Sequence, residues 1–200
     1  MLAPCCRSHL RRMMADFMEL AAIHGVRWWA DYGTILGMVR NPLTTAADYP
    51  WLDQSQLPEG PLPPGIIPHD KDCDLGTFAE DWRELVKVAE GLREKGYHVK
   101  IRRESASIKI RLSEINTTNI DVFTWDAAAD GIMHRRSYIQ VDRFKGKRFP
   151  RNWVEPTVQM AWEEMMIPAP NDPARFCEFR YGDSWLTPVE ANHDGVPREW

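Results

Sequence analysis

The apolar positions of the chain change their spacing several times, and each spacing predicts a different element. Near the amino terminus they recur at helical spacing up to a stop at Gly25, and they are Leu10, Met13, Met14, Phe17, Leu20, Ala21 and His24. The β-branched and aromatic run 26–32 (VRWWADY) predicts a buried strand. Gly33-Thr34 breaks this strand, and residues 35–40 predict a short helix.

The second part of the pattern predicts a strand, a helix and three more strands. Residues 66–78 have strand character, and an apolar stripe over 78–95 predicts a helix that ends before Gly96. Strands are predicted at 97–103, 107–112 and 119–125, and residues 126–155 predict loop with short strands. Asn171-Asp172-Pro173 predicts the start of a last helix that runs to Tyr181. Helices on a small mixed sheet indicate an α+β domain.

Residues 41–67 differ in composition from the rest of the chain. From Asn41 to Pro68 there are seven of the 15 prolines, two glycines and no Lys or Arg. So many prolines exclude a regular helix or a central strand. We therefore expect a long surface loop inserted into a single domain that spans residues 1–200. Trp51, which lies in this segment, is a candidate for stacking on a base or a sugar.

Composition excludes several classes of protein. The 200 residues suit one domain, and 25 basic against 29 acidic residues give a net charge of -4. This balance gives no general attraction to nucleic acid or to anionic membranes, so no nucleic-acid partner is expected. No apolar run approaches the ~20 residues of a transmembrane helix. The four cysteines form no CxxC pair, which fits a reducing compartment, and we expect a cytoplasmic location.

The strongest chemical signal is the acidic run Asp70-Lys71-Asp72-Cys73-Asp74. In an extended chain alternate side chains share a face, so Asp72 and Asp74 point the same way. Like charges held side by side repel unless a cation lies between them, and oxygen ligands suit Mg²⁺ or Mn²⁺. Asp121, a lone acid between apolar residues of a predicted strand, is the expected third carboxylate because a buried charge needs a partner or a metal.

Four further residues are candidates for substrate binding. Gly33-Thr34 is predicted to follow a strand and open a helix, which presents backbone N–H groups and a hydroxyl to an anion. Arg40, about two helical turns later, is within reach of a phosphate. Lys109 alternates with apolar residues of a predicted strand and is a candidate to line the same cleft.

The chain resembles the LicD/fukutin family in three places. The first is the run 31–40 (DYGTILGMVR), the second is Ile67-Pro68-His69-Asp70-Lys71-Asp72-Cys73-Asp74, and the third is the run 181–188 (YGDSWLTP). The family pattern has a Gly-Thr-x-Leu-Gly-x-x-Arg turn, a Pro-Trp-Asp-x-Asp-x-Asp strand and a carboxy-terminal Tyr-Gly motif. This sequence departs from it at His69 in place of Trp, at Lys71 within the acidic run, and by the inserted segment 41–67.

The resemblance implies a nucleotidyltransferase-like fold and a transferase activity. It implies that Asp72, Asp74 and Asp121 hold a divalent metal and act in catalysis, and that Gly33, Thr34 and Arg40 bind phosphates. Asp70, in the same acidic run, joins Lys109 among the candidate substrate-binding residues. Relatives transfer a phospho-alcohol, such as phosphocholine or ribitol phosphate, from a CDP-activated donor to a glycan.

Two other functions remain open from the sequence. The same carboxylates suit the transfer of a nucleotide from a nucleoside triphosphate to a small molecule, a protein or an RNA end. The third alternative is a catalytically silent domain that binds a nucleotide or a glycan. The presence of all three aspartates stands against a silent domain.

Overall fold

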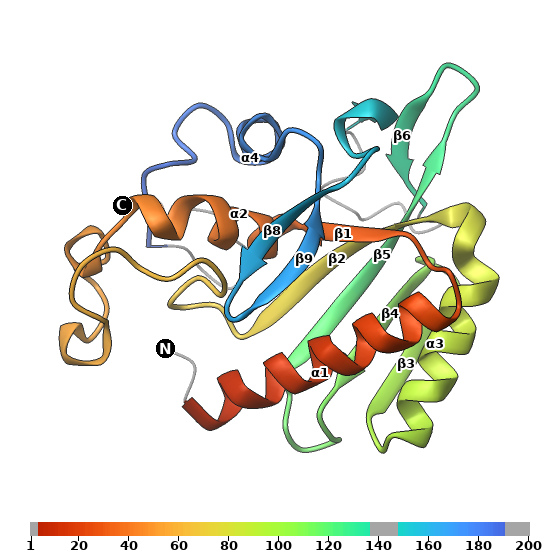
Figure 1. Ribbon diagram of the computed structural model, residues 1–200, viewed down its shortest axis with the longest axis horizontal. Coiled ribbons are helices and arrows are strands. Elements are labelled where there is room, and N and C mark those ends of the chain that lie inside the picture. The colour runs from red at the N-terminus through yellow and green to blue at the C-terminus, as the bar shows by residue number, and fades with distance from the viewer. Residues whose placement is uncertain (1–3, 137–147, 191–200) are drawn as a thin grey trace.

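A mixed β-sheet forms the centre of the structure, a computed structural model that describes residues 4–136 and 148–190 (Figure 1). The principal strands lie in the order β1-β2-β5-β4-β3, with β2 and β5 parallel and the other neighbours antiparallel. Short strands β6 and β7 continue the sheet beside β5. The strands are β1 Trp28–Asp31, β2 Asp72–Phe78, β3 His98–Arg102, β4 Ser107–Arg111, β5 Asn119–Ala127, β6 Ile132–Arg135 and β7 Phe149–Pro150.

Helices pack on both sides of these strands, which confirms the predicted α+β class. Helices α1 (Pro4–Ile23) and α3 (Trp82–Glu94) pack together against one side, and α2 (Tyr32–Arg40) packs with α4 (Pro173–Tyr181) toward the other (Figure 1). The side chains of β2, β4 and β5 that face α1 and α3 are apolar and buried, and they include Cys73, Leu75, Ile108, Ile110, Ile120 and Val122. The opposite face of the same strands therefore carries their polar side chains.

The structure differs from the sequence prediction in three places. Strand β2 begins at Asp72 rather than at residue 66, because the chain turns just before it, where the Asp70 N–H donates to the Ile67 carbonyl at 2.9 Å. Helix α2 begins at Tyr32, so Gly33-Thr34 lie inside its first turn instead of preceding it. The hairpin of β8 (Val158–Trp162) and β9 (Met165–Ala169) was not predicted, and it packs against β1.

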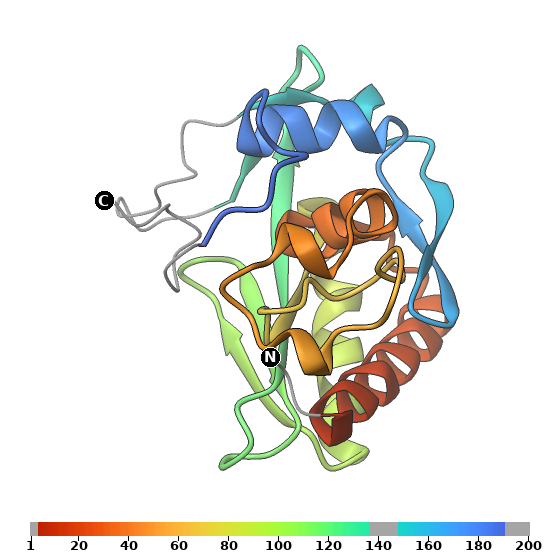
Figure 2. The same cartoon turned by 90° about the vertical axis from the view of Figure 1, so that its left-hand side faces the viewer.

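The inserted segment 41–67 is folded back onto the domain. It contains three short 3₁₀ helices, Asn41–Leu43, Ala46–Asp48 and Gln54–Gln56, and a bridge between Thr45 and Pro61. Tyr49 and Leu62 are buried in the core, so the prolines shape a packed element rather than a free loop. Figure 2 shows this segment (orange to gold) on the side turned toward the viewer, next to α2. Among the described helices, none has the length and apolar character needed to span a membrane.

Candidate active site

The polar face of β2 carries the acidic pair that the sequence singles out. Asp72 and Asp74 are half-buried, whereas Cys73 and Leu75, which alternate with them, are fully buried against the other face. The alternation expected of an extended chain is therefore confirmed, and both carboxylates lie on the side of the sheet away from α1 and α3.

Strand pairing places the third predicted aspartate beside this pair. Asp74 lies in register with Asp121 on the parallel strand β5 and with Asp31 on the antiparallel strand β1. Asp121 is in turn opposite Lys109 on β4, and the Lys109 Nζ lies 2.6 Å from the Asp121 Oδ2. Residues in register share a face of the sheet. One row across β1, β2, β5 and β4 therefore carries three carboxylates and then an ammonium group, in the order Asp31, Asp74, Asp121 and Lys109.

The Asn119 side chain lies between the carboxylates of Asp72 and Asp121. Its Nδ2 donates to the Asp121 Oδ2 at 3.0 Å and lies 3.4 Å from the Asp72 Oδ2. The Asp121 Oδ1 is buried and has no hydrogen-bond partner among the described residues. Such an atom is costly to bury, so the site contains an acceptor that is prepared for a cation or a donor from a ligand.

The concentration of negative charge shifts the protonation of these groups. Burial raises the pKa of Asp74 well above its usual value, and the charges of Asp72 and Asp121 raise it further. Burial and Asp72 likewise raise the pKa of Asp70 to about 7, and the guanidinium of Arg40 opposes this shift. The site therefore holds carboxylates whose repulsion a bound cation would relieve.

Gly33 and Thr34 join the first turn of α2 to the acidic strand. A Cβ atom added at Gly33 would lie 2.7 Å from the Asp70 Oδ2, so a larger residue here would force the Asp70 carboxylate to move. The Thr34 hydroxyl accepts a hydrogen bond from the Asp74 N–H at 2.7 Å and is buried. The two residues thus fix the start of α2 against β2. Whether they also bind phosphate stays a prediction.

Arg40 lies at the other end of α2 and is 5% exposed, which is unlike a solvated arginine at a helix end. Its Nη1 donates to the Trp185 carbonyl at 3.3 Å, so it binds the segment that follows α4 to the end of α2. Burial lowers the pKa of His69, and the positive charge of Arg40 lowers it further; the same charge opposes the rise in the pKa of Asp70. Its contact with a phosphate also stays a prediction.

A buried ion pair beside the site was not predicted. Asp31 accepts from the Tyr32 N–H and caps α2, and its two carboxylate oxygens lie 2.8 and 3.0 Å from the Arg180 Nη2. The two side chains are 0% and 1% exposed. Rings surround the guanidinium, with the Tyr32 centroid at 4.4 Å and the Trp125 centroid at 4.7 Å. Asp31 and Arg180 are far apart in the chain, so no local sequence pattern signalled this contact.

Tyr181 is a further residue of the site, from the last turn of α4. Desolvation of its hydroxyl raises the pKa well above the usual value, and the nearby charges of Asp74 and Asp70 add to the shift, while 38% of the residue as a whole is exposed. The Tyr-Gly motif of the sequence is therefore placed next to the acidic strand. Gly182 ends the helix with φ of 81°, a conformation that favours glycine.

The polar face carries ligands of the kind that a divalent cation takes, although they are not gathered into a preformed site in the part of the chain that the structure describes. Within residues 4–136 and 148–190, no three acidic, histidine or cysteine side chains converge as a ready metal site. The ammonium of Lys109 occupies the approach to the Asp121 Oδ2, which holds that carboxylate toward β4. The chemistry still fits a hard cation, because the candidates are all carboxylates, repel one another, and include the unpartnered Asp121 Oδ1.

The sequence of this chain matches a known protein family. Residues 64–172 match the family model described as LicD/FKTN/FKRP, nucleotidyltransferase domain. The chain is 26% identical to ribitol 5-phosphate transferase FKRP of Mus musculus over 90% of its own length and 32% of that protein. It is 24% identical to ribitol-5-phosphate transferase FKTN of Mus musculus over 90% of its length and 34% of that protein. The chain therefore spans about a third of the length of these curated relatives.

A solved structure also matches at low identity. The lincomycin-bound lincosamide antibiotic adenylyltransferase LnuA is 12% identical, with 82% of each chain covered and a TM-score of 0.46.

Proposed function

Because the chain belongs to the LicD/FKTN/FKRP family, we propose that it transfers a phospho-alcohol from a CDP-activated donor to a glycan hydroxyl. The observation that carries this proposal is the in-register pairing of Asp74 with Asp121 beside Asp72 on one polar face. The names of the relatives support ribitol phosphate as the transferred group, with phosphocholine as the other candidate alcohol phosphate.

Asp72, Asp74 and Asp121 are the residues that would hold Mg²⁺ or Mn²⁺. When bound, the metal would neutralise the charge of the donor pyrophosphate. For Asp121 to hold the metal through its Oδ2 as well as through its unpartnered Oδ1, its carboxylate would have to leave the Lys109 ammonium, which lies 2.6 Å from the Oδ2. In that arrangement the Lys109 side chain would gain a free donor for a phosphate oxygen, so its positive charge would stay in the site.

The other side chains bind and orient. Helix α2 begins at the acidic face, so its first N–H groups near Gly33 favour a phosphate. Asp70, whose pKa of about 7 lies near neutrality, is suited to hold a substrate hydroxyl or release a proton close to this turn. Asp121 is also the candidate base for the acceptor hydroxyl, through the carboxylate oxygen that would not hold the metal. Arg40 holds the segment that follows α4 against the end of α2.

The test is the release of CMP from CDP-ribitol, CDP-choline and CDP-glycerol with Mg²⁺ or Mn²⁺, alone and with a glycan acceptor. The proposal predicts metal-dependent CMP release from one CDP-alcohol and the appearance of its phospho-alcohol on the glycan. Release of pyrophosphate from CTP, ATP or UTP, with no reaction of any CDP-alcohol, would instead establish nucleotidyl transfer. A protein that binds CDP-alcohols and releases nothing would be a silent relative.

A further inference from the structure

Four basic side chains of β3 and β4 share the face of the acidic residues. Lys109 lies in register with Asp121, and Lys100 lies in register with Lys109. Side chains two positions apart in a strand point the same way, so Arg102 and Arg111 lie on this face as well. We call these four side chains the cationic strip: Lys100, Arg102, Lys109 and Arg111. The polar face of the sheet is therefore acidic on β1, β2 and β5 and basic on β4 and β3.

Three cations of the strip have no carboxylate partner. Lys109 is paired with Asp121, whereas Lys100, Arg102 and Arg111 form no ion pair among the residues that the structure describes. Lys100 is exposed, and the two arginines are half-buried. Lys100 and Lys109 also lie directly opposite each other, and like charges in this arrangement destabilise a sheet. The strip thus carries positive charge that the rest of the fold does not neutralise.

Protection of the sheet edge explains only part of this charge. β3 is the outermost strand at its end of the sheet, and lysine on such a strand prevents pairing with other chains. β4 lies between β3 and β5, so Lys109 and Arg111 have no such role. Helix α3 packs against both strands on their other face, where Ile108 and Ile110 are buried. The charges of β4 on the polar face therefore point to a ligand.

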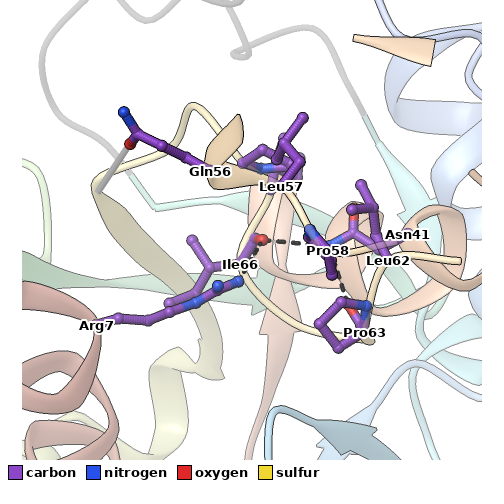
Figure 3. A pocket seen from close by; sticks show the side chains of 10 residues that line it. Arg7, Asn41, Gln56, Leu57, Pro58, Leu62, Pro63 and Ile66 are labelled. Atoms are coloured by element: carbon purple, nitrogen blue, oxygen red, sulfur yellow. Dashed lines mark hydrogen bonds between the residues drawn. The ribbon is translucent and has the colours of Figure 1, made fainter. Parts of the chain in front are cut away.

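Two cavities of the structure are unsuited to an acceptor glycan. The cavity between the insertion and α1 (Figure 3) holds about 30 Å³, which is room for one or two water molecules. The wider cleft beside Arg27 and Phe78 lies at the opposite ends of β1 and β2 from Asp31 and Asp72. The face of β4 and β3, by contrast, continues directly from Asp121 on β5.

The spacing of the strands determines where an anion on the strip would lie. Neighbouring strands are about 4.8 Å apart, so the backbone of Lys100 on β3 lies about 10 Å from that of Asp121 on β5. A CDP-alcohol carries its negative charges in its diphosphate, which the proposed function places at the carboxylates. A further anion at the distance of Lys100 therefore belongs to the acceptor, and to a unit other than the one whose hydroxyl reacts.

We infer that the cationic strip binds an anionic group of the acceptor glycan, a phosphodiester or a carboxylate, on a unit beyond the one that is modified. Arg102 and Arg111 are suited to this role, because a guanidinium can donate to two oxygens of such a group at once. The inference rests on the proposed function for the role of acceptor, whereas the binding of an anionic glycan does not depend on it. The strip would then select acceptors that are already charged.

The experiment measures binding of the full chain to three short oligomers of equal length by titration calorimetry. Oligogalacturonate carries carboxylates, its methyl ester is neutral, and a glycerol phosphate oligomer carries phosphodiesters, so the probes distinguish the two sources of charge. Lys100→Glu is compared with Arg83→Glu, which changes the net charge equally. Arg83 is exposed on α3, on the other side of the sheet.

We expect at least one anionic oligomer to bind and the methyl ester to bind about tenfold more weakly or less. Lys100→Glu should weaken binding of the anionic oligomer by about tenfold or more, and Arg83→Glu should retain it. Added salt should weaken the binding as well, since the strip is open to solvent. Thermal melting checks that both variants fold.

Three results would overturn the inference: no binding of either anionic oligomer, equal binding of the methyl ester, or equal binding by Lys100→Glu and the unaltered protein. Equally tight binding of a single-stranded DNA oligomer would also overturn it, because the strip would then hold any polyanion. CMP release from CDP-ribitol into water needs no acceptor and tests the proposed function separately. A protein that releases CMP and binds no anionic glycan disproves only the role of the strip, and the reverse result disproves only the transfer.

Discussion

Replacement of Arg180 by methionine is the most informative test of how the site is held together. Arg180→Met leaves the Asp31 carboxylate, which is 0% exposed, without the guanidinium that now lies 2.8 and 3.0 Å from its two oxygens. Removal of one partner of a buried ion pair destabilises proteins by about 3–5 kcal/mol, since a buried charge is left uncompensated. The rings around Arg180 limit the access of water, so we expect the effect to fall in this range.

The assay is urea denaturation followed by circular dichroism, with Asp31→Asn and the double variant as controls. Asparagine at position 31 can still cap α2, because its side-chain oxygen accepts from the Tyr32 N–H as aspartate does. The double variant should therefore be more stable than the sum of the single effects predicts, by about 1–3 kcal/mol. A loss below about 1 kcal/mol for Arg180→Met, or strict additivity, would refute the argument that this pair fixes α4 to the start of α2.

Three other substitutions have definite expected outcomes. Gly33→Ala places a Cβ at 2.7 Å from the Asp70 Oδ2, so thermal melting should show a folded protein while CMP release falls; unchanged turnover would contradict the close approach. Gly76→Ala brings a Cβ to 2.2 Å from the Trp29 ring and should cost about 1–3 kcal/mol in urea unfolding, and a neutral effect would show that the ring moves freely. Lys109→Met removes the ammonium that competes for Asp121, so calorimetry should show tighter Mn²⁺ binding, whereas weaker binding would mean that Lys109 supports the metal indirectly.

The period of the apolar residues predicted the principal elements because each has one face in the core. The stripe on α3 and the alternation in β3 and β4 follow directly from burial against α1 and the rest of the sheet. The start of β2 was placed too early because Ile66 and Ile67 are buried in the core without being paired in a strand. Apolar character alone cannot distinguish these two kinds of burial.

The predicted site was incomplete because its remaining members depend on contacts between distant parts of the chain. Alternation placed Asp72 and Asp74 on one face, and the isolated charge of Asp121 in an apolar strand indicated its place beside them. The contact between Asp31 and Arg180 joins residues on β1 and α4, and no local pattern reports it. The burial of Arg40 was also missed, since the Trp185 carbonyl that it binds follows α4.

The most direct test of the central claim is a comparison of Asp72→Asn with Asp130→Asn, measured by CMP release from the CDP-alcohol that the protein uses and by thermal melting. Asp130 is exposed, and its Oδ1 accepts from the Ile132 N–H, a role that asparagine retains. Since Asp72 is one of several charges that repel each other on the polar face, its neutralisation should leave the melting temperature unchanged or raise it. The account predicts that Asp72→Asn loses turnover while it stays folded, and that Asp130→Asn retains both. Full turnover by Asp72→Asn would contradict the assignment of this acidic face as the active site.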